Sequence, residues 1–223
     1  MNLLNLYQEV LDEKYIQLKE ETASYSYRRE GNILYIFFEW SNGINDWKNN
    51  FDFPAKPYRD MPDRWYAHRG FLKVWKVVEE KLAPLINDKQ IKEIIIAGYS
   101  HGAALALLCH EYCMFNRRDI KHHISGYGFG CPRVVFGFLR KSVKERFNGF
   151  HVIRNKKDIV THLPPVFLLF RHVGEIVTIG NVEWNSIDAH RPENYLESLK
   201  NYETTQNKKT ITHLILKKPV MQT

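Results

Sequence analysis

The chain has 223 residues, of which 44% are hydrophobic and 26% charged, the balance of an ordinary soluble globular protein. This length favours one domain, and we expect a single domain over residues 1–223. The net charge of +7 is spread in short clusters with no nucleic-acid motif beside them. The clusters therefore favour solvated surface, or transient attraction to anionic lipid or acidic substrates, over DNA or RNA binding.

Targeting signals and cysteines point to the same setting. Residues 1–21 lack the three regions of a signal peptide, and no later stretch is apolar for long enough to span a bilayer. Cys109, Cys113 and Cys131 form no metal-ligand pattern. Cys109 and Cys113 lie four apart on a predicted helix, which favours packed thiols over a disulfide. We expect a cytoplasmic, reducing location; an exported form that had lost its signal is the alternative.

The first third of the chain begins with helical and strand patterns. Apolar residues at helical spacing predict an amphipathic helix over 3–21, and the β-rich run 33–38 predicts a strand buried on both faces. Residues 42–54 again place apolar side chains at helical spacing, with Asn and Asp on the other face. This pattern fits a short lid that hinges over a site and, equally, a surface helix with ordinary packing.

The remaining elements follow in alternation. Residues 54–68, rich in Pro, Asp and Arg, predict a loop, and the next segment predicts a helix to about residue 85, where Pro84 ends or kinks it. We expect a basic, irregular tail over 207–223, with a candidate edge strand at 211–216. The other predicted elements are strands over 91–97, 122–130, 150–154 and 175–179 and helical segments over 101–115, 134–147 and 191–202.

The most informative stretch joins the 91–97 strand to the 101–115 helix. Its five residues from Gly98 to Gly102, centred on Ser100, match Gly-x-Ser-x-Gly, the nucleophile elbow that exposes a serine hydroxyl above a sheet. Side chains at the two glycines would collide in so sharp a turn. The stretch predicts an α/β-hydrolase fold, with a mostly parallel central sheet flanked by helices.

A serine of this kind needs two partners. A histidine must take the hydroxyl proton, and a carboxylate must orient that histidine; in α/β-hydrolases both follow the serine, acid first. Asp158 comes directly after the 150–154 strand, where the acid belongs, although an Asx turn would also explain it. His190, in a loop that follows the strand predicted over 175–179, is the expected base. Three other histidines are less well placed to be the base. His162 lies too close to Asp158 in the chain, His172 flanks a predicted strand, and His213 lies in the tail.

Donors for a developing oxyanion are also predicted. The backbone N–H of His101 follows the serine at a helix N-terminus, whose dipole favours negative charge. Ser41, just beyond the 33–38 strand, is placed to supply the second donor. The pair His122-His123 has no carboxylate or thiolate at ligand spacing, so we expect no metal. Gly126, Gly128 and Gly130 alternate along a predicted strand that does not lead into a phosphate-cradling turn, so we expect no nucleotide cofactor.

Six motifs in sequence resemble those of the class 3 lipases, the triacylglycerol lipase family, over about residues 31–200. The resemblance implies that Ser100, Asp158 and His190 are the catalytic triad, that Ser41 and His101 form the oxyanion hole, and that 42–54 is the lid. The motifs are Phe38-Glu39-Trp40-Ser41, His68-Arg69-Gly70-Phe71, the elbow through Leu105, Gly130-Cys131-Pro132-Arg133-Val134, Asp158 to Pro165, and His190 with Tyr195.

Two features differ from the family pattern. Glu39-Trp40 stands where the family usually has Arg-Gly, and the 42–54 segment is polar for an enzyme of oil droplets. Both favour a phospholipid, lysolipid or short soluble ester. We therefore expect a serine hydrolase that cleaves carboxylic esters of lipids, acylglycerol or phospholipid, through an acyl-enzyme. The alternatives are a short-chain carboxylesterase or thioesterase, and a lipase-like binding protein without catalysis.

Overall fold

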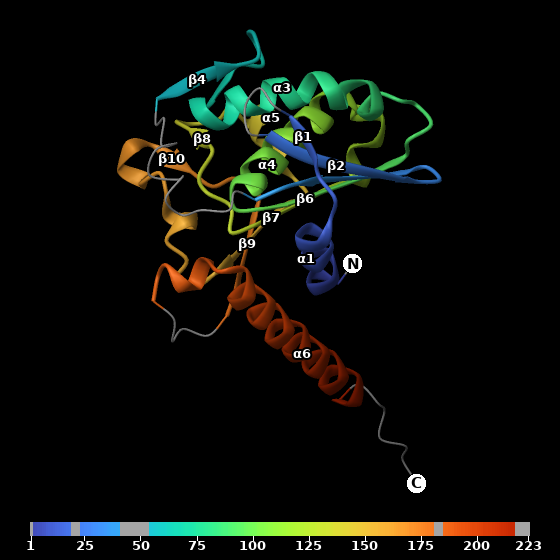
Figure 1. The fold of residues 1–223 in the computed structure, drawn as a ribbon, viewed down its shortest axis with the longest axis vertical. Helices are drawn as coiled ribbons and strands as arrows, with labels where there is room; N and C mark the ends of the chain where they lie inside the picture. Colours follow the sequence, from blue (N-terminus) through green and yellow to red (C-terminus); the bar gives the residue numbers. More distant parts are fainter. Residues whose placement is uncertain (1, 19–22, 41–53, 181–184, 217–223) are drawn as a thin grey trace.

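The computed structural model describes residues 2–18, 23–40, 54–180 and 185–216, with side chains for all of these except 23 and 207–216 (Figure 1). Ser41 and the predicted lid segment up to residue 53 therefore lie outside the described residues. Among the described residues, no helix is long and apolar enough to cross a membrane.

A seven-stranded sheet forms the centre of the molecule (Figure 1). Across the sheet its strands are β1 (Ile16–Leu18), β2 (Ala23–Glu30), β3 (Ile33–Phe38), β6 (Glu93–Tyr99), β7 (Ile124–Phe129), β9 (Phe150–Asn155) and β11 (Glu175–Ile179). The pairs from β3 to β11 are parallel, and the pairs β1–β2 and β2–β3 are antiparallel. The predicted α/β-hydrolase architecture, with its mostly parallel sheet, is confirmed.

Helices cover both faces of this sheet. The helices α3 (Arg69–Ile86) and α4 (His101–Asn116) lie on one face, and α1 (Leu3–Asp12) and α6 (Pro192–Leu216) lie on the other (Figure 1). Alternate residues of β3 enter the two cores, with Ile36 facing α3 and α4 and Phe37 facing α1 and α6. Because both faces are covered, the strand is apolar throughout, as the sequence predicted.

A smaller antiparallel sheet lies beside the large one, in the order β10-β8-β5-β4; its strands are β4 (Ala55–Tyr58), β5 (Trp65–His68), β8 (Val135–Phe136) and β10 (Phe170–Arg171). The prediction of a loop over 54–68 is therefore wrong. Trp65 and Ala67 are buried and Tyr66 is exposed, which is strand periodicity. Four residues are too few for this period to stand out among Pro, Asp and Arg.

Three other predictions are corrected. The helix predicted over 3–21 ends at Asp12, and two strands that were not predicted follow it, β1 from Ile16 and β2 from Ala23. The helical segment predicted over 134–147 contains β8 and Gly137, whose φ of 73° ends helical geometry. The tail residues 211–216 continue α6 instead of forming an edge strand, because a helix nucleated earlier in the chain propagates through them. Within the described ranges, the remaining short helices are α5 (Lys141–Lys144), η1 (Arg118–His123), η2 (Glu145–Phe147), η3 (Val160–His162), η4 (Val166–Leu168) and η5 (Asp188–His190).

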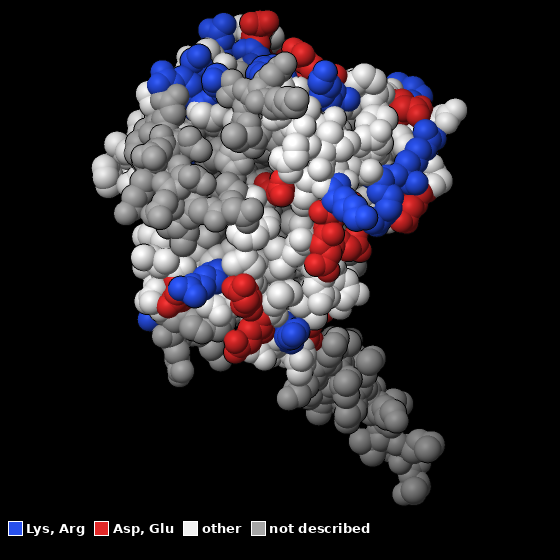
Figure 2. All heavy atoms as spheres, in the orientation of Figure 1, with Lys and Arg blue, Asp and Glu red and all other residues white. Residues whose placement is uncertain are grey.

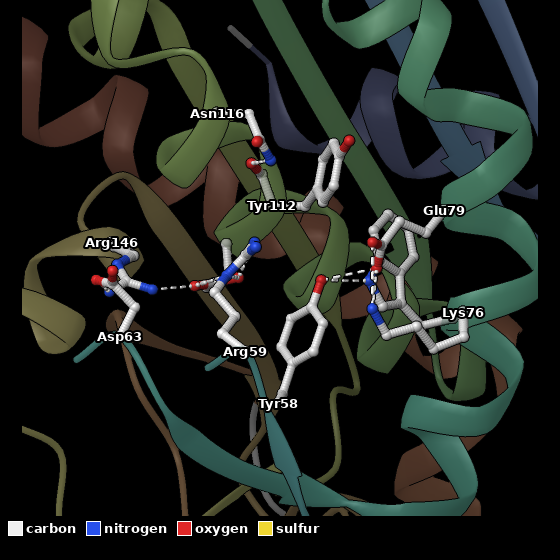
Figure 3. A network of polar contacts seen from close by, with 10 residues as sticks. Tyr58, Arg59, Asp63, Lys76, Glu79, Tyr112, Asn116 and Arg146 are labelled. Atoms are coloured by element: carbon white, nitrogen blue, oxygen red, sulfur yellow. Dashed lines mark hydrogen bonds and ion pairs between the residues drawn. The ribbon is translucent and has the colours of Figure 1, made fainter. Parts of the chain in front are cut away.

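A buried ionic network fastens the β4–β5 hairpin to the helical layer (Figure 3). The fully buried Glu111 of α4 accepts hydrogen bonds from Arg59 at 2.8 Å and from Arg146 at 2.7 Å. Arg146 also pairs with Asp63 in the turn of the hairpin, and the Tyr58 hydroxyl donates to Glu79 of α3 at 2.8 Å. Glu111 is thus the point at which the two arginines are neutralised.

The carboxyl ends of the parallel strands meet at one edge of the large sheet. β6 ends at Tyr99 and β9 at Asn155, so the loops that follow them, which carry Ser100 and Asp158, come together there. All three cysteines are free and buried: Cys109 and Cys113 lie on α4, as the packed thiols predicted there, and Cys131 follows β7.

Candidate functional site

The serine turn has the geometry that the elbow pattern predicts. Ser100 adopts φ 56° and ψ −119° between β6 and α4, and its backbone N–H donates to the Phe129 carbonyl at 2.8 Å. A Cβ at Gly98 would lie 2.3 Å from the Gly102 carbonyl oxygen, and a Cβ at Gly102 would lie 2.3 Å from the Phe38 carbonyl oxygen. Both glycines are therefore required on steric grounds, and the strained serine is held by the strand before it and the helix after it.

Ser100, His190 and Asp158 form one hydrogen-bonded chain. His190 Nε2 lies 2.8 Å from Ser100 Oγ, and His190 Nδ1 lies 2.8 Å from Asp158 Oδ2. All three side chains are buried. With the carboxylate accepting from Nδ1–H, Nε2 is left to accept the serine proton. The structure thus brings together the three residues predicted from the sequence, from positions up to 90 residues apart.

Asp158 has two further donors. Its Oδ1 accepts the backbone N–H of Val160 at 2.8 Å, and its Oδ2 accepts the Tyr195 hydroxyl at 2.6 Å. The first contact is that of an Asx turn, so the two interpretations of Asp158 hold together. The Tyr195 oxygen in turn accepts the N–H of Asn155 at 3.1 Å. Burial, and then the charge of Asp158, raise the pKa of Tyr195 well above its usual range, which keeps this hydroxyl protonated as a donor.

The backbone of His190 is fixed from two sides. The Tyr99 ring stacks on the imidazole, with centroids 5.2 Å apart, and its hydroxyl donates to the His190 carbonyl. Asn155 holds the preceding carbonyl, that of Ala189, at 2.9 Å. A Cβ at Gly130 would lie 2.9 Å from His190 Cε1, so this glycine gives the ring its space. Sequence reasoning did not assign Tyr99 a role, because only its place inside the elbow pattern marked it.

Of the two predicted oxyanion donors, the structure describes His101 but not Ser41. His101 is the first residue of α4, so its N–H has no acceptor within the helix and lies at the positive end of the helix dipole. Burial lowers the pKa of the His101 side chain to about 4, so the imidazole is neutral at physiological pH and adds no charge. Trp40, the residue before Ser41, packs against Tyr99 with ring centroids 5.8 Å apart, so its large side chain has a packing partner beside the elbow. Ser41, the other predicted donor, is outside the described residues.

Two other histidines near the site have different partners. His172 Nε2 lies 2.7 Å from the Thr161 carbonyl, and burial lowers the pKa of His172 to about 4. The backbone carbonyl of His162 pairs with Arg133, and burial followed by the charge of Arg133 lowers the pKa of His162. Among the described residues, no group of three or more His, Cys, Asp or Glu side chains is placed to hold a metal ion.

The arrangement is suited to nucleophilic attack. A hydroxyl on a strained turn, a histidine within hydrogen-bond distance and a buried carboxylate behind it are the parts of a serine hydrolase site. The adjacent helix N-terminus offers an N–H donor where an oxyanion would form.

Comparisons with known proteins point the same way. The chain is 30% identical to a lipase from Rhizomucor miehei over 149 residues, covering 64% of this chain and 40% of that protein. It is 26% identical to phospholipase A1-II 6 of Oryza sativa subsp. japonica over 166 residues, covering 58% of this chain and 40% of that protein. It therefore spans less than half the length of these curated relatives.

A solved structure of a triacylglycerol lipase, described as having a serine protease triad at its catalytic centre, superposes with a TM-score of 0.65. It is 26% identical in sequence, and the match covers 75% of this chain and 66% of that one. The family model for lipase (class 3) matches residues 35–168. Because this stretch is more than half of the sequence and contains the elbow and Asp158, the chain belongs to the class 3 lipase family.

Proposed function

We propose that the protein is a serine hydrolase that cleaves the carboxylic ester bonds of lipids, acylglycerols or phospholipids, through an acyl-enzyme. Ser100 is the nucleophile, His190 the general base and acid, and Asp158 the group that orients the histidine. The observation that carries the proposal is the unbroken hydrogen-bonded chain from Ser100 Oγ through both ring nitrogens of His190 to Asp158 Oδ2. Family membership and relatives that are lipases and a phospholipase support it.

Acylation begins with attack of Ser100 Oγ on the carbonyl carbon of the ester, while its proton passes to His190 Nε2. The carbonyl oxygen becomes an oxyanion, and the imidazolium that forms is stabilised by Asp158. When the tetrahedral species collapses, the alcohol leaves with the proton from Nε2, and the acyl group stays on Ser100. Water, deprotonated by the same Nε2, then attacks the acyl-enzyme and releases the fatty acid and the free serine.

The oxyanion requires donors that are already in place. The N–H of His101 is the first donor in this proposal, and Ser41 is proposed as the second on the basis of its position after β3. Loss of one such donor from an enzyme of this class typically costs about 3 kcal/mol of transition-state stabilisation. The neutral side chain of His101 leaves its backbone N–H as the group that acts.

A panel of esters tests the function. We expect hydrolysis of long-chain monoacylglycerol and phosphatidylcholine dispersions, with activity that rises once the substrate aggregates, and no hydrolysis by Ser100→Ala. The p-nitrophenyl esters of increasing chain length serve as soluble references. Activity confined to short soluble esters would make the protein a carboxylesterase, and no activity on any ester in folded protein would contradict the proposal.

A further inference from the structure

A group of large apolar side chains is exposed at the end of the small sheet. They come from two neighbouring loops, one after β8 and one that leads into β10, and we call them the apolar rim. In the rim, Phe138 is 87% exposed, Phe167 82%, Val166 60%, Leu169 49% and Leu168 38%. Isolated exposed apolar residues are common, but five that adjoin one another mark a contact surface.

Backbone contacts hold the two loops of the rim together. The Gly137 N–H donates to the Leu169 carbonyl at 3.0 Å. The adjoining β8–β10 pair places Phe136 beside Phe170, with ring centroids 5.3 Å apart. Leu169 has a φ of 65°, a left-handed conformation that a large L-residue rarely adopts. The rim is therefore a built surface on a short paired sheet and not the fraying end of a loop.

Positive charge borders the rim. The Arg171 guanidinium lies 4.3 Å from the centre of the Phe138 ring, and the exposed Arg140 follows two residues later. Between residues 132 and 174 the sequence has nine Lys and Arg, of which Arg133 and Arg146 are buried, and only two carboxylates. One of the two, Asp158, is buried in the triad, so Glu145 alone faces solvent. Figure 2 shows further Lys and Arg around β4, at the opposite edge of the small sheet, with Asp and Glu among them.

The rim is continuous with the site. Asp158 is followed by the 39% exposed Ile159, then by η3 and, after two prolines, by the rim segment of η4. Arg133 clamps this connection, since its backbone N–H donates to the Leu163 carbonyl at 2.7 Å and its guanidinium to Pro164 at 3.0 Å. A surface that contacts the rim would thus lie beside the loop that carries the triad carboxylate.

We propose that the rim docks the protein on lipid bilayers that carry anionic headgroups, with Phe138 and Phe167 inserted among the headgroups. Aromatic rings favour this interfacial depth, and the flanking arginines are attracted to the negative surface. Neither an apolar insert nor a basic patch holds a protein firmly by itself, whereas the two together do. The inference rests on the proposed function, because docking there would place the Ser100 site next to its lipid substrate.

The test is sedimentation of the whole chain with vesicles, in a Ser100→Ala background that cannot consume the lipid. We expect binding to phosphatidylcholine vesicles that contain phosphatidylglycerol, weaker binding to pure phosphatidylcholine, and loss of the difference at high salt, which screens surface charge. The double variant Phe138→Ser, Phe167→Ser should bind the anionic vesicles at least about tenfold more weakly than the parent, because two large apolar groups are lost. Arg140→Gln with Arg171→Gln should remove the preference for anionic vesicles.

The matched control is Ile16→Ser with Tyr27→Ser, which removes two exposed apolar side chains at the far edge of the large sheet. This control should bind like the parent, and the rim variants with Ser100 intact should keep their activity on a soluble short ester. Equal vesicle binding by parent and rim variant would overturn the proposal, as would a dimer in solution that the rim variant dissociates. If the parent binds vesicles but intact protein hydrolyses no ester, the proposed function fails and the docking surface stands.

Discussion

At the scale of single residues, Tyr195 bears most directly on the triad from outside it. Its hydroxyl donates to the same Asp158 oxygen that faces His190, and it accepts the N–H of Asn155. Both contacts are buried, so no water can replace the hydroxyl without a rearrangement. Tyr195 is therefore a positioning residue, which acts on the reaction through the carboxylate.

Replacing Tyr195 with Phe removes this donor and leaves the ring in place. We expect kcat on a soluble ester to fall about tenfold with KM unchanged, because a hydrogen bond to a charged group contributes about 1.5 kcal/mol or more. Tyr202→Phe, on the same helix and packed against the same core, is the control and should keep its kcat. An unchanged kcat for Tyr195→Phe would show that the hydroxyl does not position Asp158.

His172 makes folding stability depend on pH. Burial, with the nearby charges of Arg133 and Arg154, lowers its pKa from 6.5 to about 4. Between these two values the unfolded chain binds more protons than the folded one, so stability rises with pH across this window and levels off above it. His101 and His110, whose pKa values burial also lowers to about 4, act in the same direction.

We expect the urea midpoint to be lower at about pH 5 than at about pH 7, and His172→Gln to reduce this difference. A glutamine amide can still donate to the Thr161 carbonyl but takes up no proton. His123→Gln, at an exposed histidine, is the control. If His172→Gln left the pH difference as large as in the parent, burial of the neutral ring would not be a source of it.

At the scale of elements, Glu111 joins the small sheet to α4. It is the shared acceptor for two arginines, one on the β4–β5 hairpin and one on η2. A buried ion pair adds little over an apolar replacement of both partners, but removing one partner strands the other charge. The hairpin is thus held by a contact that tolerates no partial loss.

We therefore expect Glu111→Gln to lower the free energy of unfolding by about 3 kcal/mol, since Arg59 loses the carboxylate it pairs with and Arg146 keeps only Asp63. Urea unfolding measures the change. The exposed Glu80→Gln on α3 is the matched control and should stay within about 0.5 kcal/mol of the parent. A Glu111→Gln protein as stable as this control would mean that Asp63 and solvation suffice to stabilise the two arginines.

The elements of the central sheet were predictable, and those of the small sheet were not. The strands over β3 and β6 are buried on both faces, so their apolar runs stand out in the sequence. The strands β8 and β10 have two residues each and depend on pairing with strands distant in sequence, β8 with β5 and β10, and β10 with β8. The tail was misread because its β-branched residues favour a strand locally, while α6 runs through them.

The residues that the structure brings together at the site were easier to predict than the small sheet. Ser100, Asp158 and His190 each follow or precede a recognisable element, so their order in the chain was enough to select them. Tyr99 and Asn155 were missed as supports because their partners are backbone carbonyls, which leave no pattern in a sequence. The second oxyanion donor, Ser41, remains a prediction.

At the scale of the whole molecule, the net charge of +7 is concentrated in one part of the chain. Much of it lies in the segment that also carries the apolar rim, beside the edge of the sheet where the triad is assembled. The fold, the triad and the rim are then parts of one proposal, in which the protein meets its substrate at an anionic lipid surface. The proposal of catalysis depends first on Ser100 being an activated nucleophile.

The most direct measurement is therefore mass spectrometry of the folded protein after reaction with a fluorophosphonate, which traps an activated serine. We expect one covalent adduct, located in the peptide that contains Ser100, absent from Ser100→Ala and formed far more slowly by His190→Ala. Folded protein that stays unmodified, or that is modified at another residue, would contradict the assignment of Ser100 as the nucleophile.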